Sequence, residues 1–220
     1  MKTSLGSALS LLLLVQNSLQ DDSPADKACK ALQEKYPKLT AHGLDPRYAK
    51  ANTGMQFFSF FAFFVFVLRM CTILTTIIDF YTASAMLGPK CVFEPSSSDE
   101  MAEAVLTLRN VSSPFAIRGG GHMPIGDAAN INSTGVLLSS YGLTQVTVSD
   151  DRKTVNVGPG NHWVDVYRGL EPYGLSVVGG RLGVVGVPGL LLGGGVSFFG
   201  NEYGWASANI ASYTVCMALS

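Results

Sequence analysis

Two glycine clusters are the segments of this sequence best suited to chemistry. The first is Arg118-Gly119-Gly120-Gly121-His122, and the second occupies residues 179–195. Because glycine has no Cβ, its backbone can approach a ligand closely and turn N–H groups toward it. Such groups suit a pyrophosphate, and two distant clusters could hold a long cofactor from two sides. The alternative is that the glycines mark tight turns between strands, and glycine content alone leaves this open.

His122 ends the first cluster, directly after its three glycines. An imidazole after a glycine turn at a strand end is well placed to touch a ligand, although a lone histidine is more often structural. Other catalytic motifs are missing from the sequence: G-x-x-x-x-G-K-[ST], G-x-G-x-x-G, G-x-S-x-G, H-E-x-x-H and C-x-x-C. Their absence argues against a phosphate loop of the NTPase kind, the usual dinucleotide fingerprint, a hydrolase elbow and a metal site.

A strand–helix–strand pattern must position the first cluster. Residues 91–95 predict a short strand ended by Pro95, and Ser97 with Glu100 forms a capping box. Met101, Val105 and Leu108 then mark one helical face with the spacing i, i+4, i+7. Residues 114–118 predict a second strand. The spacing indicates a βαβ unit with parallel strands that ends at the glycines.

Strands dominate the segment between the two clusters. Residues 135–139 predict one strand, and residues 145–148 and 154–157 predict a hairpin around a polar turn. Asn161 can cap the next helix, which carries Trp163, Tyr167 and Leu170 on one face. An apolar segment, 175–178, leads into the second cluster.

These residues together resemble a known flavoprotein family. Ile117 through His122, G-P-G before a helix, and the run from Gly179 to Gly195 are similar to the FAD-binding (PCMH-type) domain of the vanillyl-alcohol oxidase / p-cresol methylhydroxylase family. The similarity is greatest to the branch of berberine bridge enzyme and the fungal oligosaccharide oxidases. It covers residues 29–52 and 87–218, with 206–218 fitting the family's following strand. The resemblance implies an α+β fold, with a small βαβ lobe and a mixed, largely antiparallel sheet lobe around FAD.

The same resemblance implies how FAD is held. In the family, the histidine of R-G-G-G-H is tethered to the flavin 8α carbon, so His122 is expected to carry covalent FAD. Members with two tethers use a cysteine where this sequence has Leu182, which predicts a single tether. The expected cofactor-binding residues are Arg118, Gly119, Gly120, Gly121, His122, Gly179, Gly180, Leu182, Gly183, Gly186, Gly189, Gly193, Gly194 and Ile210.

The function that the resemblance implies is a secreted FAD-dependent oxidase of alcohols or sugars, with oxygen as a candidate electron acceptor. Family members continue well beyond the equivalent of Ser220, and their catalytic base lies in that later part. The sequence therefore identifies no acid or base residue here. Two alternatives stay open: a truncated, non-catalytic flavin-binding remnant, and a single-pass membrane protein anchored by residues 57–78.

Composition supports a mosaic chain. The 220 residues carry a formal net charge of −1, which argues against a protein that binds nucleic acid by its charge. Of 24 glycines, 20 lie between Gly119 and Gly204; of 12 phenylalanines, 8 lie between Phe57 and Phe80. The glycine-rich part belongs to the predicted FAD-binding domain, residues 87–220, and the phenylalanine-rich part does not.

The N-terminal residues indicate export. Lys2 followed by an apolar core at residues 8–15 predicts a signal peptide over residues 1–20. Residues 21–53 predict a helical segment that opens near Pro24. The family resemblance places a disulfide between Cys29 and Cys91, and leaves Cys71 and Cys216 free. Asn110 and Asn132 begin glycosylation sequons, which matter only in an exported chain.

The apolar block at residues 54–86 has no place in the family pattern. Residues 57–68 carry no charge, which suggests a transmembrane helix, but Arg69 would lie near the bilayer centre. The rival hypothesis is a translated intron from about Gly54 to Thr82, since Gly54-Met55 can be encoded GGT-ATG, which contains a splice donor. A mature transcript that retains the block would exclude the intron.

Overall fold

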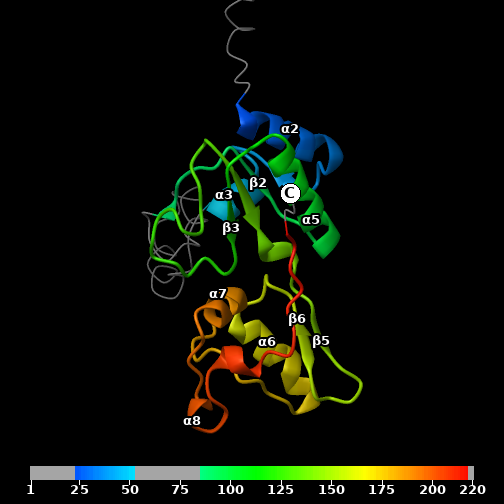
Figure 1. The fold of residues 1–220 in the computed structure, drawn as a ribbon, viewed down its shortest axis with the longest axis vertical. Helices are drawn as coiled ribbons and strands as arrows, with labels where there is room; N and C mark the ends of the chain where they lie inside the picture. Colours follow the sequence, from blue (N-terminus) through cyan, green and yellow to red (C-terminus); the bar gives the residue numbers. More distant parts are fainter. Residues whose placement is uncertain (1–22, 53–84, 218–220) are drawn as a thin grey trace, which may run out of the picture.

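The computed structural model describes residues 23–52 and 85–217, arranged in two lobes (Figure 1). The predicted signal peptide, nearly all of the apolar block and Cys71 lie outside the described residues. The first lobe holds the four-stranded sheet and the helices α2, α3 and α5. The second lobe holds a two-stranded sheet with α6, α7 and α8. The mixed α+β class predicted from the sequence is confirmed.

The sheet of the first lobe has the strand order β1-β2-β4-β3. Its strands are β1 (Thr40–Ala41), β2 (Cys91–Phe93), β3 (Phe115–Arg118) and β4 (Val136–Ser139). β2 and β3 both run parallel to β4, and β1 pairs antiparallel with β2. The predicted parallel βαβ unit is present, but β4 lies between its two strands.

Helices cover both faces of this sheet. α2 (Pro24–Lys35) and α5 (Ser98–Asn110) pack on one face, where Phe93 and Leu138 join the largest core cluster. α3 (Pro46–Asn52) packs on the other face, where Ala51 meets Val92 and Leu137. Successive side chains of a strand point to opposite faces, so β2 and β4 contribute to both cores. β2 and β4 are buried along their whole length, and β3 is held in place because it pairs with β4 up to Arg118.

Serine side chains cap both long helices, and the cap at Ser97 was predicted from the sequence. The Ser23 hydroxyl accepts a hydrogen bond from Asp26 N at 3.2 Å, and the Ser97 hydroxyl accepts one from Glu100 N at 3.2 Å. The Glu100 carboxylate accepts in return from the backbone N–H of Ser96, one residue before the cap. These bonds satisfy N–H groups that a helix terminus leaves without partners.

The second lobe starts with the predicted hairpin. β5 (Val146–Val148) and β6 (Val155–Val157) pair antiparallel, and α6 (Trp163–Leu170) packs its buried face against their valines. The N-cap of α6 is His162 rather than Asn161. The Asn161 amide instead donates to Gly158 O at 2.9 Å and to Gln145 O at 3.2 Å, which ties the hairpin to the turn before the helix.

Short helices complete this lobe. They are η3 (Glu171–Tyr173), α7 (Val187–Leu192), α8 (Gly200–Tyr203) and η4 (Ala206–Asn209), with η2 (Ser140–Gly142) leading in from the first lobe. The apolar segment 175–178 forms no strand; its side chains Leu175 and Val177 pack into the α6 cluster instead.

The C-terminal segment connects the lobes (Figure 1). Residues 206–218 were expected to form a strand. Instead η4 occupies their start, and residues 211–217 pair with no strand of the described chain. The segment reaches the first lobe, where the Cys216 thiol donates to Ser98 O at 3.5 Å and packs against the core cluster. Within the described residues, no helix is both long and apolar enough to cross a membrane.

Candidate functional site

The two glycine clusters meet at the junction of the lobes. A Cβ built on Gly120 would lie 2.4 Å from Gly186 Cα, and one on Gly119 would lie 2.9 Å from Pro188 Cγ. Real Cβ atoms do not approach other atoms so closely, so only glycine fits at position 120. The end of β3 and the start of α7 are therefore in backbone contact.

His162 holds this contact from a third segment. It forms an isolated antiparallel bridge with Gly186, and its Nε2 lies 3.4 Å from Gly120 O. Val187 N donates to the neighbouring Asn161 O at 3.0 Å. The turn before α6 thus touches both glycine clusters and fixes their separation.

Several backbone N–H groups at this junction donate to no acceptor in the described part of the chain. Within residues 23–52 and 85–217, no oxygen accepts from the N–H of Gly119, Gly120 or Gly121, nor from that of Gly179 or Gly180. Except for Gly119, these glycines are buried, and buried N–H groups are nearly always paired in native proteins. Gly121 has φ +69°, so the chain turns sharply here. Such a turn with unpaired N–H groups suits a bound anion.

His122 follows directly and is partly buried. Burial lowers the pKa of its imidazole, and the nearby His162 lowers it further. A lowered pKa keeps the ring neutral at neutral pH, and a neutral imidazole is the form that can act as a nucleophile. The residue therefore combines position beside the N–H groups with the protonation state needed for covalent chemistry.

The Arg118 side chain serves the fold rather than the glycine junction. It is 0% exposed, and its guanidinium donates to Ala51 O at the end of α3 and to the Tyr141 hydroxyl at 2.8 Å. The guanidinium carbon also lies 4.7 Å from the centre of the Tyr141 ring. The expectation that Arg118 lines the cofactor loop can therefore hold for its backbone only.

The remaining predicted residues fall into three places. Gly179, Gly180 and Gly183 pack against Trp163 and Val164 of α6. Gly193 and Gly194 end α7, and Gly194 O accepts from Ser207 N of η4 at 2.9 Å, three residues before Ile210. Gly189 has open space around it, and the Leu182 side chain is 60% exposed.

Three residues of the junction were not predicted from the sequence: His162, Pro188 and Trp163. His162 belongs to the G-P-G-N-H turn before α6, and its proximity to Gly120 follows only from the packing of the lobes. The Trp163 ring leaves no room for a side chain at two glycines. A Cβ on Gly179 would lie 2.2 Å from a ring atom, and one on Gly180 would lie 2.5 Å away. The only sequence feature that pointed to these residues is that the helix starting near Trp163 precedes the second glycine cluster in the chain.

Comparison with known proteins gives a family match. The family model described as FAD binding domain matches residues 89–219. The FAD-dependent monooxygenase prx3 of Penicillium roqueforti is 45% identical over 143 residues, which are 64% of this chain. The aligned part spans 28% of that relative, so the chain corresponds to about a quarter of its length.

Solved structures share the fold. Physcomitrella patens BBE-like 1 superposes with a TM-score of 0.62 at 22% identity, covering 81% of this chain and 33% of that one. The 6-hydroxy-D-nicotine oxidase of Arthrobacter nicotinovorans superposes with a TM-score of 0.52 at 27% identity, covering 56% and 27%. The flavoprotein resemblance found in the sequence is confirmed.

Proposed function

Because this chain belongs to the FAD-binding domain family, we propose that it forms the cofactor-holding part of a FAD-dependent oxidoreductase. The observation that carries the proposal is the contact between Gly120 and Gly186 beside His122. That contact joins two segments whose unpaired N–H groups suit a pyrophosphate, and it places an imidazole next to them.

The described residues suggest which groups would hold FAD. The backbone N–H groups of Gly119, Gly120 and Gly121 would bind the pyrophosphate, together with those of Gly179 and Gly180. His122 would supply the covalent tether at the flavin 8α carbon, and Leu182 excludes a second, cysteine tether. When bound, FAD supplies an acceptor for the hydride removed from the substrate. The tether would keep the cofactor on an exported protein.

We assign the substrate to small alcohols or carbohydrates, with oxygen as the electron acceptor. Relatives at 40–45% identity are named FAD-dependent monooxygenases, and a structural neighbour at 27% identity is named an oxidase. These names support oxygen as a partner of the flavin. No described residue is matched to a catalytic base.

Absorbance and mass spectrometry test the cofactor proposal. The chain expressed with FAD available should be yellow, and acid precipitation should leave the flavin with the protein. Peptide mapping should find the flavin on His122. His122→Ala should release flavin on acid treatment, whereas the matched control His42→Ala, in the first lobe beside α2, should not. A colourless folded protein, or flavin attached elsewhere, contradicts the proposal.

A non-catalytic flavin-binding remnant is the second candidate. Turnover separates the two: primary alcohols and sugars added to the yellow protein should bleach the flavin without oxygen and yield hydrogen peroxide with it. A yellow protein that never bleaches supports the remnant. Extraction that requires detergent would support a membrane anchor at residues 57–78.

Secretion is proposed on two further observations. A disulfide joins Cys29 and Cys91, which fits an oxidising compartment. Both sequon asparagines, Asn110 and Asn132, lie exposed on the first lobe, where a glycan would meet solvent. A mobility shift on treatment of the expressed protein with a peptide-N-glycosidase is expected, and an unshifted band from a glycosylating host contradicts it.

A further inference from the structure

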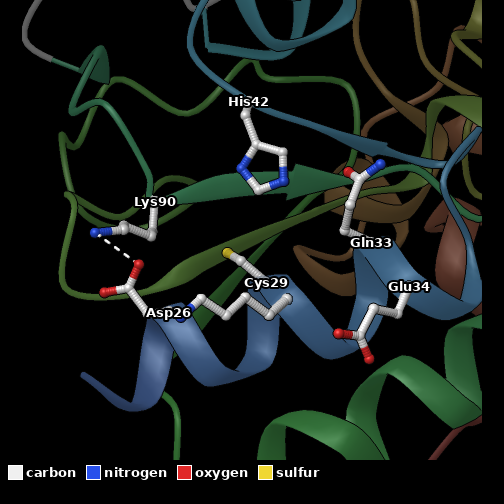
Figure 2. A pocket seen from close by; sticks show the side chains of 7 residues that line it. Asp26, Cys29, Gln33, Glu34, His42 and Lys90 are labelled. Carbon is white, nitrogen blue, oxygen red and sulfur yellow. Dashed lines mark ion pairs between the residues drawn. The ribbon is translucent and has the colours of Figure 1, made fainter. Parts of the chain in front are cut away.

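A second cluster of reactive side chains lies in the first lobe, away from the glycine junction. It consists of Cys29 on α2, Cys91 at the start of β2, and His42 directly after β1. One ligand atom from each lies within 4.8 Å of the other two. Figure 2 shows the Cys29 sulfur and the His42 ring at the cavity above α2. In the structure the two sulfurs form a disulfide.

Strand pairing explains why His42 is present. β1 and β2 pair with Thr40 opposite Phe93 and Ala41 opposite Val92. Continuing this register places His42 opposite Cys91, and opposite residues of an antiparallel pair lie on the same face. α2 packs on this face, and Cys29 lies on its buried side. Three separate elements therefore direct sulfur and nitrogen atoms to one point.

This donor set is the one that zinc prefers. Two thiolates and an imidazole are common zinc ligands, with Zn–S about 2.3 Å and Zn–N about 2.0–2.1 Å, so tetrahedral ligand atoms lie about 3.5–3.8 Å apart. The Cα atoms of Cys29 and Cys91 are 6.0 Å apart. Side-chain rotation alone could therefore open the sulfurs to that spacing once the S–S bond is broken.

The cavity beside the cluster can accept a cation. It has a volume of about 420 Å³, and Asp26, Glu34 and Lys90 are among its lining residues. The Lys90 ammonium lies 2.9 Å from an Asp26 carboxylate oxygen, so its charge is offset. Two thiolates would balance the 2+ charge of the ion, and the open side leaves a fourth position for water.

We propose that the reduced chain binds one Zn²⁺ through Cys29 Sγ, Cys91 Sγ and a His42 ring nitrogen, so that zinc and the disulfide are alternative links between α2 and β2. A phosphine reductant breaks the S–S bond, and with one water it becomes the phosphine oxide while two thiols form. Zn²⁺ then displaces both thiol protons to solvent as two Zn–S bonds form. The proposal goes beyond flavin binding and does not depend on it.

Metal titration of the full chain tests this proposal. Zn²⁺ added to phosphine-reduced protein should bind at one equivalent, and Co²⁺ in its place should show a thiolate charge-transfer band. The oxidised protein should bind neither ion at this site. His42→Ala, which leaves both cysteines, should weaken binding by at least about 10-fold. The matched control Gln33→Ala, from the same cavity, should bind as the parent does.

A second measurement, the alkylation rate of each cysteine, still tests the proposal if reduction destabilises the fold. Zn²⁺ should slow the alkylation of Cys29 and Cys91 but not of Cys216, which is free in the structure. If the reduced chain unfolds, restoration of its circular dichroism by Zn²⁺ supports the proposal. Equal binding by His42→Ala, absence of binding, or an unfolded reduced chain that Zn²⁺ does not restore would each overturn it.

Discussion

Gly120 and Gly186 are packed backbone against backbone, although one lies two residues after β3 and the other caps the start of α7. Each would place a Cβ within 2.6 Å of the other's backbone: 2.4 Å from Gly186 Cα in one direction and 2.5 Å from Gly120 N in the other. The contact joins the two lobes at the segments expected to hold the cofactor. It therefore links cofactor binding to lobe packing.

Gly120→Ala and Gly186→Ala should both destabilise the protein. The atoms that each new methyl meets are backbone atoms, which cannot move aside as a side-chain tip can. Overpacking of this kind costs about 1–3 kcal/mol. We expect lower midpoints of urea unfolding and loss of bound flavin in both variants.

Gly189→Ala is the matched control for these variants. It lies in α7, has open space around it and is absent from the positive-φ positions, so alanine should fit there and favour the helix. Equal stability of all three variants would contradict the role assigned to the Gly120–Gly186 contact.

Arg118→Ala should destabilise the first lobe. The substitution removes the donors to the buried Ala51 O and to the part-buried Tyr141 hydroxyl. Losing hydrogen bonds from a charged group costs about 1.5–3 kcal/mol each, so a loss of at least about 2 kcal/mol is expected from urea unfolding. Arg109→Ala, exposed near the end of α5, should change stability by less than about 0.5 kcal/mol. If both behave alike, the Arg118 contacts are not stabilising.

His122 should make the stability of the flavin-free protein depend on pH. Its pKa in the folded state is lowered, so between that value and its unfolded pKa of about 6.5 the unfolded chain binds more protons. Stability should therefore fall as the pH falls below about 6.5, and the fall should stop below the folded pKa. His122→Gln should reduce this slope. NMR titration of the His122 ring gives a direct measurement, and a folded pKa at or above the usual value would contradict it.

Removal of residues 54–84 should leave the fold intact. The Asn130 amide donates to Asn52 Oδ1 at 3.1 Å and to Ala85 O at 2.8 Å, so both flanks of the block meet at one nitrogen. Gly88 N donates to Asn52 Oδ1 as well, at 3.1 Å. The two flanks therefore lie close together, and the shortened chain keeps Thr53 as the residue that links them.

The shortened chain should have an unfolding midpoint within experimental error of the parent and should be more soluble, because it loses the phenylalanine-rich block. An unfolded product would show that the block is needed. Asn130→Ala in the shortened chain provides the check on the closure itself, since it removes both hydrogen bonds and should destabilise it. Transcript sequencing tests the intron hypothesis independently.

Local patterns predicted the elements of the first lobe well. The Ser97 cap, the buried face of α5 and the strands at its two ends all depend on neighbours within a few residues. The position of β4 between β2 and β3 could not be predicted, because strand order depends on contacts between distant segments. The same applies to His162, whose contact with Gly120 depends on how the lobes pack.

The site could be predicted only in outline. The glycines marked where backbone would have to come close, but not whether the neighbour would be ligand or protein. Gly120 and Gly186 touch each other, while Gly179 and Gly180 make room for Trp163. The Arg118 side chain turns away from the glycines, because the end of α3 offers it carbonyl acceptors that no sequence pattern reveals.

The Cys29–Cys91 bond closes a loop of sequence separation 62 that contains residues 53–84. Proteolysis anywhere in that stretch would yield two polypeptides that remain one molecule. The products would run as a single band in non-reducing electrophoresis and as two after reduction. A light chain bearing α2 and a heavy chain bearing the glycine junction could thus be prepared from one precursor and separated by reduction of the disulfide.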